Sequence, residues 1–257
     1  MLSVSDIDKH RTWVAKKENS AILYRDYQYL KLLQNVKNSR YKEYEQQIEL
    51  DIPRSFPKSI WLKHPGSQYL VKQQLKMWCL YSPIGYYQGM LFILVPLCQR
   101  FQGLDHISFF AFVEIIKQLT FLNKDVMPNV KHKQKEEVLH VIRVLAQCCK
   151  KVKSYDVDDR LVLELTIEYQ IMFTLALNRC GDTLANTDLI LDYFLEVLHD
   201  EKKFKIRLKL FSFAMMLPIL KSKLTEIELA SLEFDRDALK AIIHCALSSG
   251  TLFKAFA

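Results

Sequence analysis

The sequence predicts an all-α, multi-helix protein, and three observations support this fold class. Glycine and proline are scarce, at 6 and 7 among 257 residues, whereas a β-sandwich or barrel needs many turn residues of these types. Apolar side chains recur at spacings of three and four along most of the chain, which is the pattern of amphipathic helices. Half of the residues are hydrophobic and a quarter are charged, as in soluble globular proteins.

The chain is expected to form one main domain. Its length is sufficient to bury a full core, and neither a long low-complexity linker nor a repeat at a fixed period divides it. Residues 1–20 are polar and weakly periodic, so we predict an N-terminal entry segment there and a single domain over residues 21–257. A division of that domain into two helical lobes is left open.

The first part of the domain is predicted to hold a helix followed by a rigid loop. From residue 21 onward, apolar side chains line one face of about four helical turns, and residues 38–47 form a second short helix or a linker. In residues 48–57, Pro53 and Pro57 push the residue before each of them toward an extended conformation. We therefore expect an exposed loop or a single turn in this segment.

Two helices are predicted next, and the second should lie at the centre of the domain. The first has Ser67 as its N-cap and ends near residue 82. The second begins after Gly85 and is apolar on nearly all sides up to Cys98, as is typical of a buried helix. Residues 77–99 carry no formal charge and match a membrane span in length, but polar residues, glycines and prolines interrupt them. A buried helix is the favoured interpretation.

The rest of the chain is predicted to be helical as well. Between residues 203 and 210, charged and apolar side chains alternate as in a strand, but helix-forming residues continue to residue 220 without a turn, which favours a helix. The expected helices span residues 105–121, 133–150, 157–178, 187–195, 203–220 and 235–247.

Charge and cysteine content limit the classes of partner and site. The net charge is +7, from 36 Lys and Arg against 29 Asp and Glu, and such a charge concerns association rather than fold. Neither an RNA-binding aromatic stripe nor a helix-turn-helix pattern is evident, so we expect solvated lysines on helix faces and no nucleic-acid partner. The six cysteines show no CxxC pair and no histidine at zinc spacing, so no metal site is expected.

The same residues suggest where the protein acts. The first eleven residues contain no apolar run, so no secretory leader is expected, and free cysteines then indicate a reducing compartment. We expect a cytoplasmic protein, with peripheral association with intracellular membranes as an option.

No self-contained active site is recognisable. Nucleophile-elbow, zinc-protease, P-loop and dinucleotide-binding patterns are missing from the sequence, and the seven histidines have no recurring carboxylate or cysteine partner. Two segments nevertheless combine chemically distinctive residues. Residues 48–57 contain Asp51 and Arg54, and residues 85–90 contain Gln88 between aromatic residues and a glycine. Taken alone, the first pair is explained by a local ion pair worth about 0–1 kcal/mol, and Gln88 by a buried amide.

Taken together, the two segments resemble the two signature motifs of the TBC domain. These are Ile48-x-x-Asp51-x-x-Arg54 and Gly85-Tyr86-x-Gln88-Gly89-Met90. The TBC family consists of all-helical proteins that activate Rab GTPases.

Weaker resemblances follow downstream in the same order and extend over about residues 20–250. Residues 109–112 resemble the aromatic helix after the glutamine motif, and residues 190–194 resemble the family's late Trp-Asp segment without its tryptophan. Departures from the pattern are Ser55 in place of threonine, Tyr87 in place of cysteine, and a short link between residues 81 and 85.

The resemblance implies a mechanism in which the protein completes the active site of a partner. Arg54 would stabilise the charge that develops on the γ-phosphoryl group of GTP, and Gln88 would orient the attacking water. Asp51 would fasten the arginine segment, Tyr86 would pack beneath the glutamine, and Gly89 would allow close approach of the partner's backbone.

The implied protein is a GTPase activator and not an enzyme with its own chemistry. It would bind no cofactor or metal itself, since the partner, a Rab-type GTPase in its GTP form, carries GTP and Mg²⁺. Regulation of vesicle traffic is the implied role. The alternatives are a TBC-like scaffold that binds a GTPase without activating it, an activator associated with cell division, and a helical adaptor that uses its basic surface. The presence of both Arg54 and Gln88 favours the activator.

Overall fold

The computed structural model describes residues 20–33, 39–123, 174–180, 184, 186–224 and 236–248, and these contain helices but no strand. The predicted all-α class is therefore confirmed. The helices of the described ranges are α2 (Ser20–Leu33), α3 (Ser39–Ser55), α4 (Ile60–Lys63), α5 (Pro65–Tyr81), α6 (Gly89–Arg100), α7 (Asp105–Asn123), the 3₁₀ helix η3 (Leu177–Arg179), α10 (Thr187–Leu195), α11 (Glu201–Leu224) and α12 (Arg236–Ser248).

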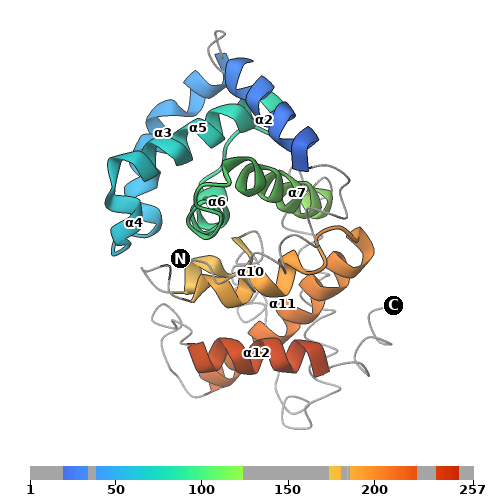
Figure 1. The fold of residues 1–257 in the computed structure, drawn as a ribbon. Coiled ribbons are helices and arrows are strands. Elements are labelled where there is room, and N and C mark those ends of the chain that lie inside the picture. The colour runs from blue at the N-terminus through green and yellow to red at the C-terminus, as the bar shows by residue number, and fades with distance from the viewer. Residues whose placement is uncertain are drawn as a thin grey trace.

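Helix α6 lies at the centre of the molecule, as predicted. It contacts α3, α5 and α7 from the N-terminal part of the chain and α10 and η3 from the C-terminal part, and Figure 1 shows it between these two groups of helices. The groups also meet where α7 contacts α11, and one continuous apolar core runs through both. The side chains that α6 buries are Met90, Leu91, Ile93, Leu94, Val95, Pro96, Leu97 and Cys98.

The prediction of a loop or single turn at residues 48–57 is wrong, because α3 continues to Ser55 and includes Pro53. Pro53 lies in the last turn, so its missing N–H and its effect on the preceding residue disturb only the helix end. The Ser55 hydroxyl donates a hydrogen bond of 2.8 Å to the carbonyl oxygen of Ile52, and the side chains of Ile48 and Ile52 are fully buried. Packing of this apolar face therefore stabilises the helix beyond the proline.

The start of α5 also differs from the prediction, because His64 and not Ser67 is the N-cap. The His64 Nδ1 atom accepts a hydrogen bond of 3.1 Å from the backbone N–H of Gly66. Pro65 begins the helix, since its fixed φ suits the first turn and its missing N–H would have no helical partner there. The helix ends at Tyr81, as predicted, with Ser82 as its C-cap.

Helix α4 was not predicted, and α6 begins at Gly89 instead of directly after Gly85. The remaining described helices lie close to their predicted ranges except near residue 175. Leu175 and Ala176 have φ angles of 53° and 57°, so the end of the helix predicted for residues 157–178 is a left-handed turn before η3. Both residues are fully buried, and an apolar run at this position does not reveal its backbone conformation. The rest of that prediction and the helix predicted for residues 133–150 lie outside the described residues. Among the described helices, none combines the length and the apolar character that crossing a bilayer requires.

The central position of α6 predicts a strong dependence of stability on its side chains. Leu94→Ala removes a fully buried side chain, so we expect the free energy of unfolding to fall by about 2–5 kcal/mol. Leu32→Ala makes the same chemical change on α2 at a side chain that is 70% exposed, and its effect should stay within about 0.5 kcal/mol. Urea denaturation measures both, and equal losses would contradict the assignment of α6 as the core helix.

Candidate functional site

Arg54 and Gln88 are both exposed. Arg54 lies in the last turn of α3 and makes no hydrogen bond or ion pair with any other residue that the structure describes. Gln88 is the residue before α6, with helical φ and ψ of −53° and −37°, and its side chain forms no capping bond. Its backbone is ordered nonetheless, because its carbonyl oxygen accepts a hydrogen bond of 3.2 Å from the N–H of Leu91. The buried amide considered for Gln88 is therefore excluded.

A buried hydrogen bond joins the arginine segment to the glutamine segment. The Tyr86 hydroxyl donates to Asp51 Oδ2 at 3.0 Å, and Gln47 Nε2 donates to the same oxygen at 2.8 Å. Asp51 is 1% exposed. Burial and, after it, the Asp51 carboxylate raise the pKa of Tyr86 well above its usual value, so the phenol keeps the proton that it donates. The local Asp51–Arg54 ion pair left open by the sequence is not formed, since the carboxylate points into the core.

A second contact joins the same two segments on the other side of Arg54 and Gln88. The rings of Phe56 and Phe92 meet nearly edge to face, with centroids 5.6 Å apart. Phe56 follows Arg54 by two residues, and Phe92 lies in the first turn of α6, beyond Gln88. The arginine and glutamine segments are therefore fastened to each other both before and after the exposed side chains of Arg54 and Gln88.

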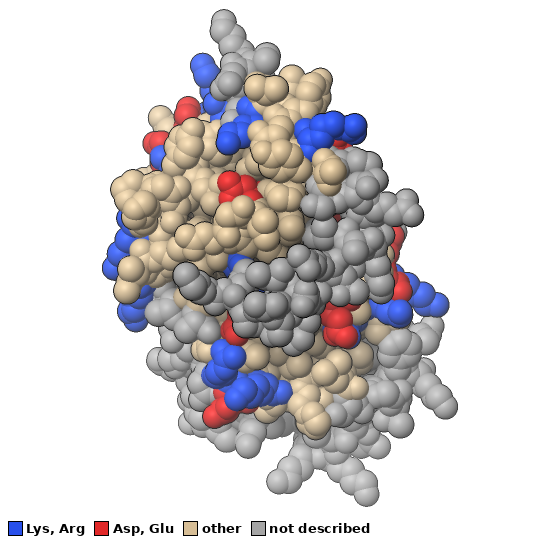
Figure 2. Space-filling model, in the orientation of Figure 1, with Lys and Arg blue, Asp and Glu red and all other residues tan. Residues whose placement is uncertain are grey.

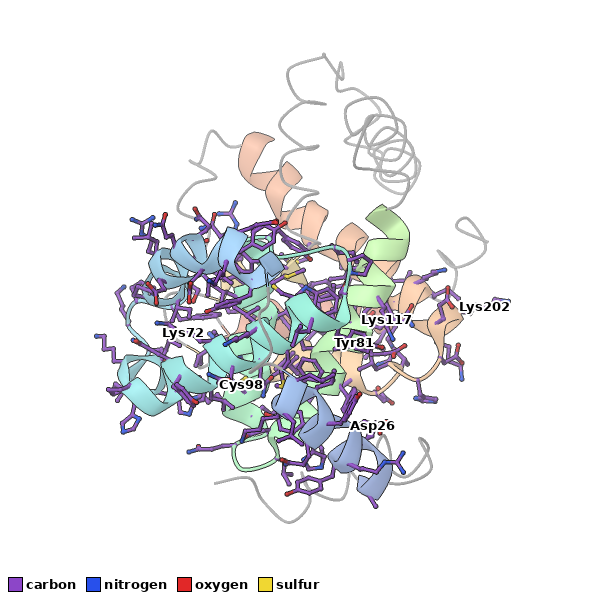
Figure 3. The ribbon with its side chains drawn as sticks, turned by 90° about the horizontal axis from the view of Figure 1, so that it is seen from above. Asp26, Lys72, Tyr81, Cys98, Lys117 and Lys202 are labelled. Carbon is purple, nitrogen blue, oxygen red and sulfur yellow. The ribbon has the colours of Figure 1, made fainter. Side chains whose placement is uncertain are left out.

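The last residue of α5, Tyr81, is held in place just before the link. Lys117 of α7 donates a hydrogen bond of 2.8 Å to the Tyr81 hydroxyl, and its ammonium lies 5.1 Å from the centre of the Tyr81 ring. Figure 3 shows the two side chains together at one side of the molecule. Ser82 then turns the chain, because its hydroxyl oxygen accepts a hydrogen bond of 3.3 Å from the N–H of Ile84. The short link is therefore anchored where it leaves the helix.

Gly89 is required by the packing of this chain itself. A Cβ atom at Gly89 would lie 2.9 Å from Cε2 of Tyr87 and 3.4 Å from Cγ2 of Thr174. The first distance is shorter than ordinary contact, so the Tyr87 ring would have to move. Close approach of a partner's backbone at Gly89 stays a prediction.

The structure reveals Gln47 as an additional supporting residue. It lies one helical turn before Asp51, where i and i+4 side chains meet, and its amide supplies the second donor to the buried carboxylate. This relationship is visible in the sequence only if residues 48–55 are recognised as helix. A loop at residues 48–57, as the prolines predict, would not place the Gln47 and Asp51 side chains next to each other.

The late segment of the resemblance forms part of α10 and fastens it to α6. The Arg100 guanidinium at the end of α6 pairs with the Asp192 carboxylate, and it also donates to the backbone oxygen of Asp188 at 3.4 Å. Ile190 and Phe194 are fully buried. This segment therefore supports the helix that follows Gln88.

Several basic residues of α11 and α12 pair with neighbouring acids. Lys203 lies 3.3 Å from Asp200, and Lys205 pairs with Glu201. In Figure 2, basic side chains gather along the left edge and in the lower part of the visible face, and acidic groups lie beside the lower ones. Within the described ranges, no three His, Cys, Asp or Glu side chains are grouped so that they could hold a metal ion.

Comparison with known families decides the relationship of the chain. A model of the Rab-GTPase-TBC domain matches residues 5–227. The chain belongs to the TBC family. The match covers both fastened segments as well as α10 and α11. TBC proteins are activators of Rab GTPases, so a Rab GTPase is the general class of partner. No curated protein and no solved structure matches the chain.

Because the Tyr86 hydroxyl bonds a buried carboxylate, we expect its removal to destabilise this TBC domain more than removal of a hydroxyl that bonds a neutral group. Tyr86→Phe removes a hydrogen bond to a buried carboxylate, so we expect the free energy of unfolding to fall by about 1.5–3 kcal/mol. Tyr193→Phe removes a hydroxyl that donates to the neutral carbonyl of Arg207 at 3.2 Å, which should cost about 0.5–1.5 kcal/mol. Urea denaturation compares the two, and a smaller loss for Tyr86→Phe would show that the buried pair does not fasten the segments.

Proposed function

We propose that this protein is a catalytically competent activator that accelerates GTP hydrolysis by a Rab-type GTPase in trans, with Arg54 and Gln88 as its two fingers. One observation carries the proposal. Both side chains are exposed and form no hydrogen bond or ion pair within the described part of the chain, yet they belong to segments that the Asp51–Tyr86 and Phe56–Phe92 contacts fasten together. Through this activity the protein would regulate vesicle traffic.

The state of Arg54 suits a catalytic role. GTP hydrolysis spreads negative charge over the γ-phosphoryl oxygens, and a positioned guanidinium stabilises that charge without the reorganisation that water requires. A carboxylate paired with the guanidinium would cancel most of this effect. Asp51 is the acidic residue nearest in the motif, and its buried bonds to Tyr86 and Gln47 keep it away from Arg54.

The state of Gln88 suits the placement of a water molecule. An amide side chain both donates and accepts hydrogen bonds, so it can hold a water between itself and the phosphoryl group. The backbone of Gln88 is set by the first turn of α6, where the N–H groups of Met90 and Leu91 donate to the oxygens of Tyr87 and Gln88 at 3.0 and 3.2 Å. An amide that starts from a fixed backbone pays less entropy when it binds water.

Arg54→Ala is expected to abolish most of the stimulated hydrolysis. On a responsive member of a panel of GTP-loaded Rab GTPases, the stimulated rate should fall by about 10³–10⁵-fold, while binding of the partner loaded with a non-hydrolysable GTP analogue survives. Arg25→Ala, which removes an exposed guanidinium from α2, is the matched control and should keep the native rate. Single-turnover phosphate release measures the rates.

Gln88→Ala is expected to lower the stimulated rate by about 10²–10³-fold, again with partner binding retained. Gln102→Ala removes an exposed amide from the turn after α6 and should have no effect. If the native protein binds a GTPase but neither Arg54→Ala nor Gln88→Ala changes the rate of hydrolysis, the protein is a scaffold and the finger assignment is wrong.

A further inference from the structure

The middle of the short link before Gln88 is held by a tryptophan of α5. The indole N–H of Trp78 donates a hydrogen bond of 2.8 Å to the carbonyl oxygen of Gly85. Trp78 is 1% exposed, and its ring meets that of Phe112 edge to face, with centroids 5.4 Å apart. The donor is therefore fixed by the core of the domain, and Gly85 lies only three residues before Gln88.

The opposite side of Gly85 is covered by a tyrosine of α3. Gly85 has a φ of +74°, which side chains other than glycine rarely adopt. A Cβ atom at this position would lie 2.5 Å from the Tyr44 hydroxyl oxygen and 2.8 Å from its Cζ. The tip of the Tyr44 ring therefore rests against the Gly85 backbone. The same ring also meets that of Tyr86, with centroids 6.3 Å apart.

We propose that Trp78 and Tyr44 form a clamp on Gly85 that positions Gln88 relative to Arg54. This inference rests on the proposed function and deepens it. Tyr44 belongs to the helix that carries Arg54, and Trp78 belongs to the helix that leads into the link. The clamp therefore holds Gly85 from α3 on one side and from α5 on the other, which fixes the glutamine segment relative to the helix that carries Arg54. Neither residue touches the reacting atoms, so both are positioning residues.

The physical reason is the conformational freedom of the link. Residues 82–88 connect α5 to α6, and the left-handed glycine is the position at which their backbone has the widest choice of conformations. A link free to move would lose entropy each time Gln88 engages a water molecule. A link clamped during folding has lost that entropy already. The Trp78 bond and the Tyr44 contact act at the glycine itself, where the restraint is most effective.

The test begins with Trp78→Phe, which removes the donor and keeps an aromatic ring. On a responsive GTPase we expect kcat of stimulated hydrolysis to fall by about 10- to 100-fold, with KM within about twofold because Arg54 and the exposed surface are unchanged. In a Gln88→Ala background, Trp78→Phe should lower the rate by less than about twofold, since its effect passes through Gln88.

Phe112→Leu is the matched control for loss of core packing. It replaces the ring that packs on Trp78 with another apolar side chain, so Trp78 stays buried and its indole N–H can still bind Gly85. We expect lower stability with kcat within about twofold of the native value. The clamp is overturned if Phe112→Leu lowers kcat as much as Trp78→Phe does, or if Trp78→Phe lowers the rate equally with and without Gln88.

A measurement without a GTPase separates the clamp from the proposed function. Hydrogen exchange of the full chain, followed by mass spectrometry, should show the peptide that covers residues 83–90 exchanging about tenfold faster in Trp78→Phe and unchanged in Phe112→Leu. If no GTPase responds to the native protein, the proposed function fails while this result still decides the clamp. Unchanged exchange in Trp78→Phe overturns the clamp even if hydrolysis is stimulated.

Tyr44→Leu provides a second variant that leaves Trp78 in place. It removes the ring tip from Gly85, and Tyr44 is only partly buried, so the chain should still fold if Trp78→Phe does not. The same faster exchange at residues 83–90 is expected, together with a fall in kcat that disappears in the Gln88→Ala background. Native exchange and native kcat in Tyr44→Leu would contradict its part in the clamp.

Discussion

The arrangement of the site depends on one buried carboxylate. Asp51 is almost fully buried, and a charge removed from water is tolerated only when it is well hydrogen-bonded. The hydroxyl of Tyr86 and the amide of Gln47 meet that requirement, and one of them comes from the other functional segment, 35 residues away. The domain cannot satisfy this carboxylate without bringing the two segments together. Stability and the geometry of the site are therefore coupled through one oxygen atom.

The same constraint explains why Arg54 has no acidic partner among the residues that the structure describes. Arg54 lies in the last turn of α3, where the carbonyl end of the helix stabilises a positive charge. The helix therefore provides some of the compensation that an acidic neighbour would otherwise supply, and it does so without occupying the guanidinium. Gln88 is in a comparable state, with its backbone hydrogen-bonded and its side chain making no hydrogen bond to the described residues. In both residues the backbone is held by a helix while the end of the side chain is exposed.

The sequence predicted the helices well because apolar periodicity reflects which face is buried. The sequence-based prediction was wrong where a rule about single residues was overridden by packing in the folded chain. Pro53 predicts the end of a helix, but in the last turn of α3 it removes only one hydrogen bond. The sequence also does not reveal that the imidazole of His64 caps α5. The motifs single out Arg54 and Gln88 as candidates, but they do not reveal the contacts that fasten the two segments, since spacing does not say which side chains meet. Trp78 looked like an ordinary apolar helix residue, because the direction of its N–H is decided by the fold.

Helix α12 packs on the domain but lies beyond the residues that the family model matches. The TBC match ends at residue 227, whereas α12 begins at Arg236 and packs against α10 and α11 with Leu239 fully buried. Arg236 also forms a two-pronged ion pair with Asp188, at 3.2 and 3.1 Å, at the start of the helix that Arg100 joins to α6. A chain cut at residue 227 would retain Arg54 and Gln88 but lose the helix that covers α10 and α11. In this protein the packed core therefore extends beyond the residues that the family model matches.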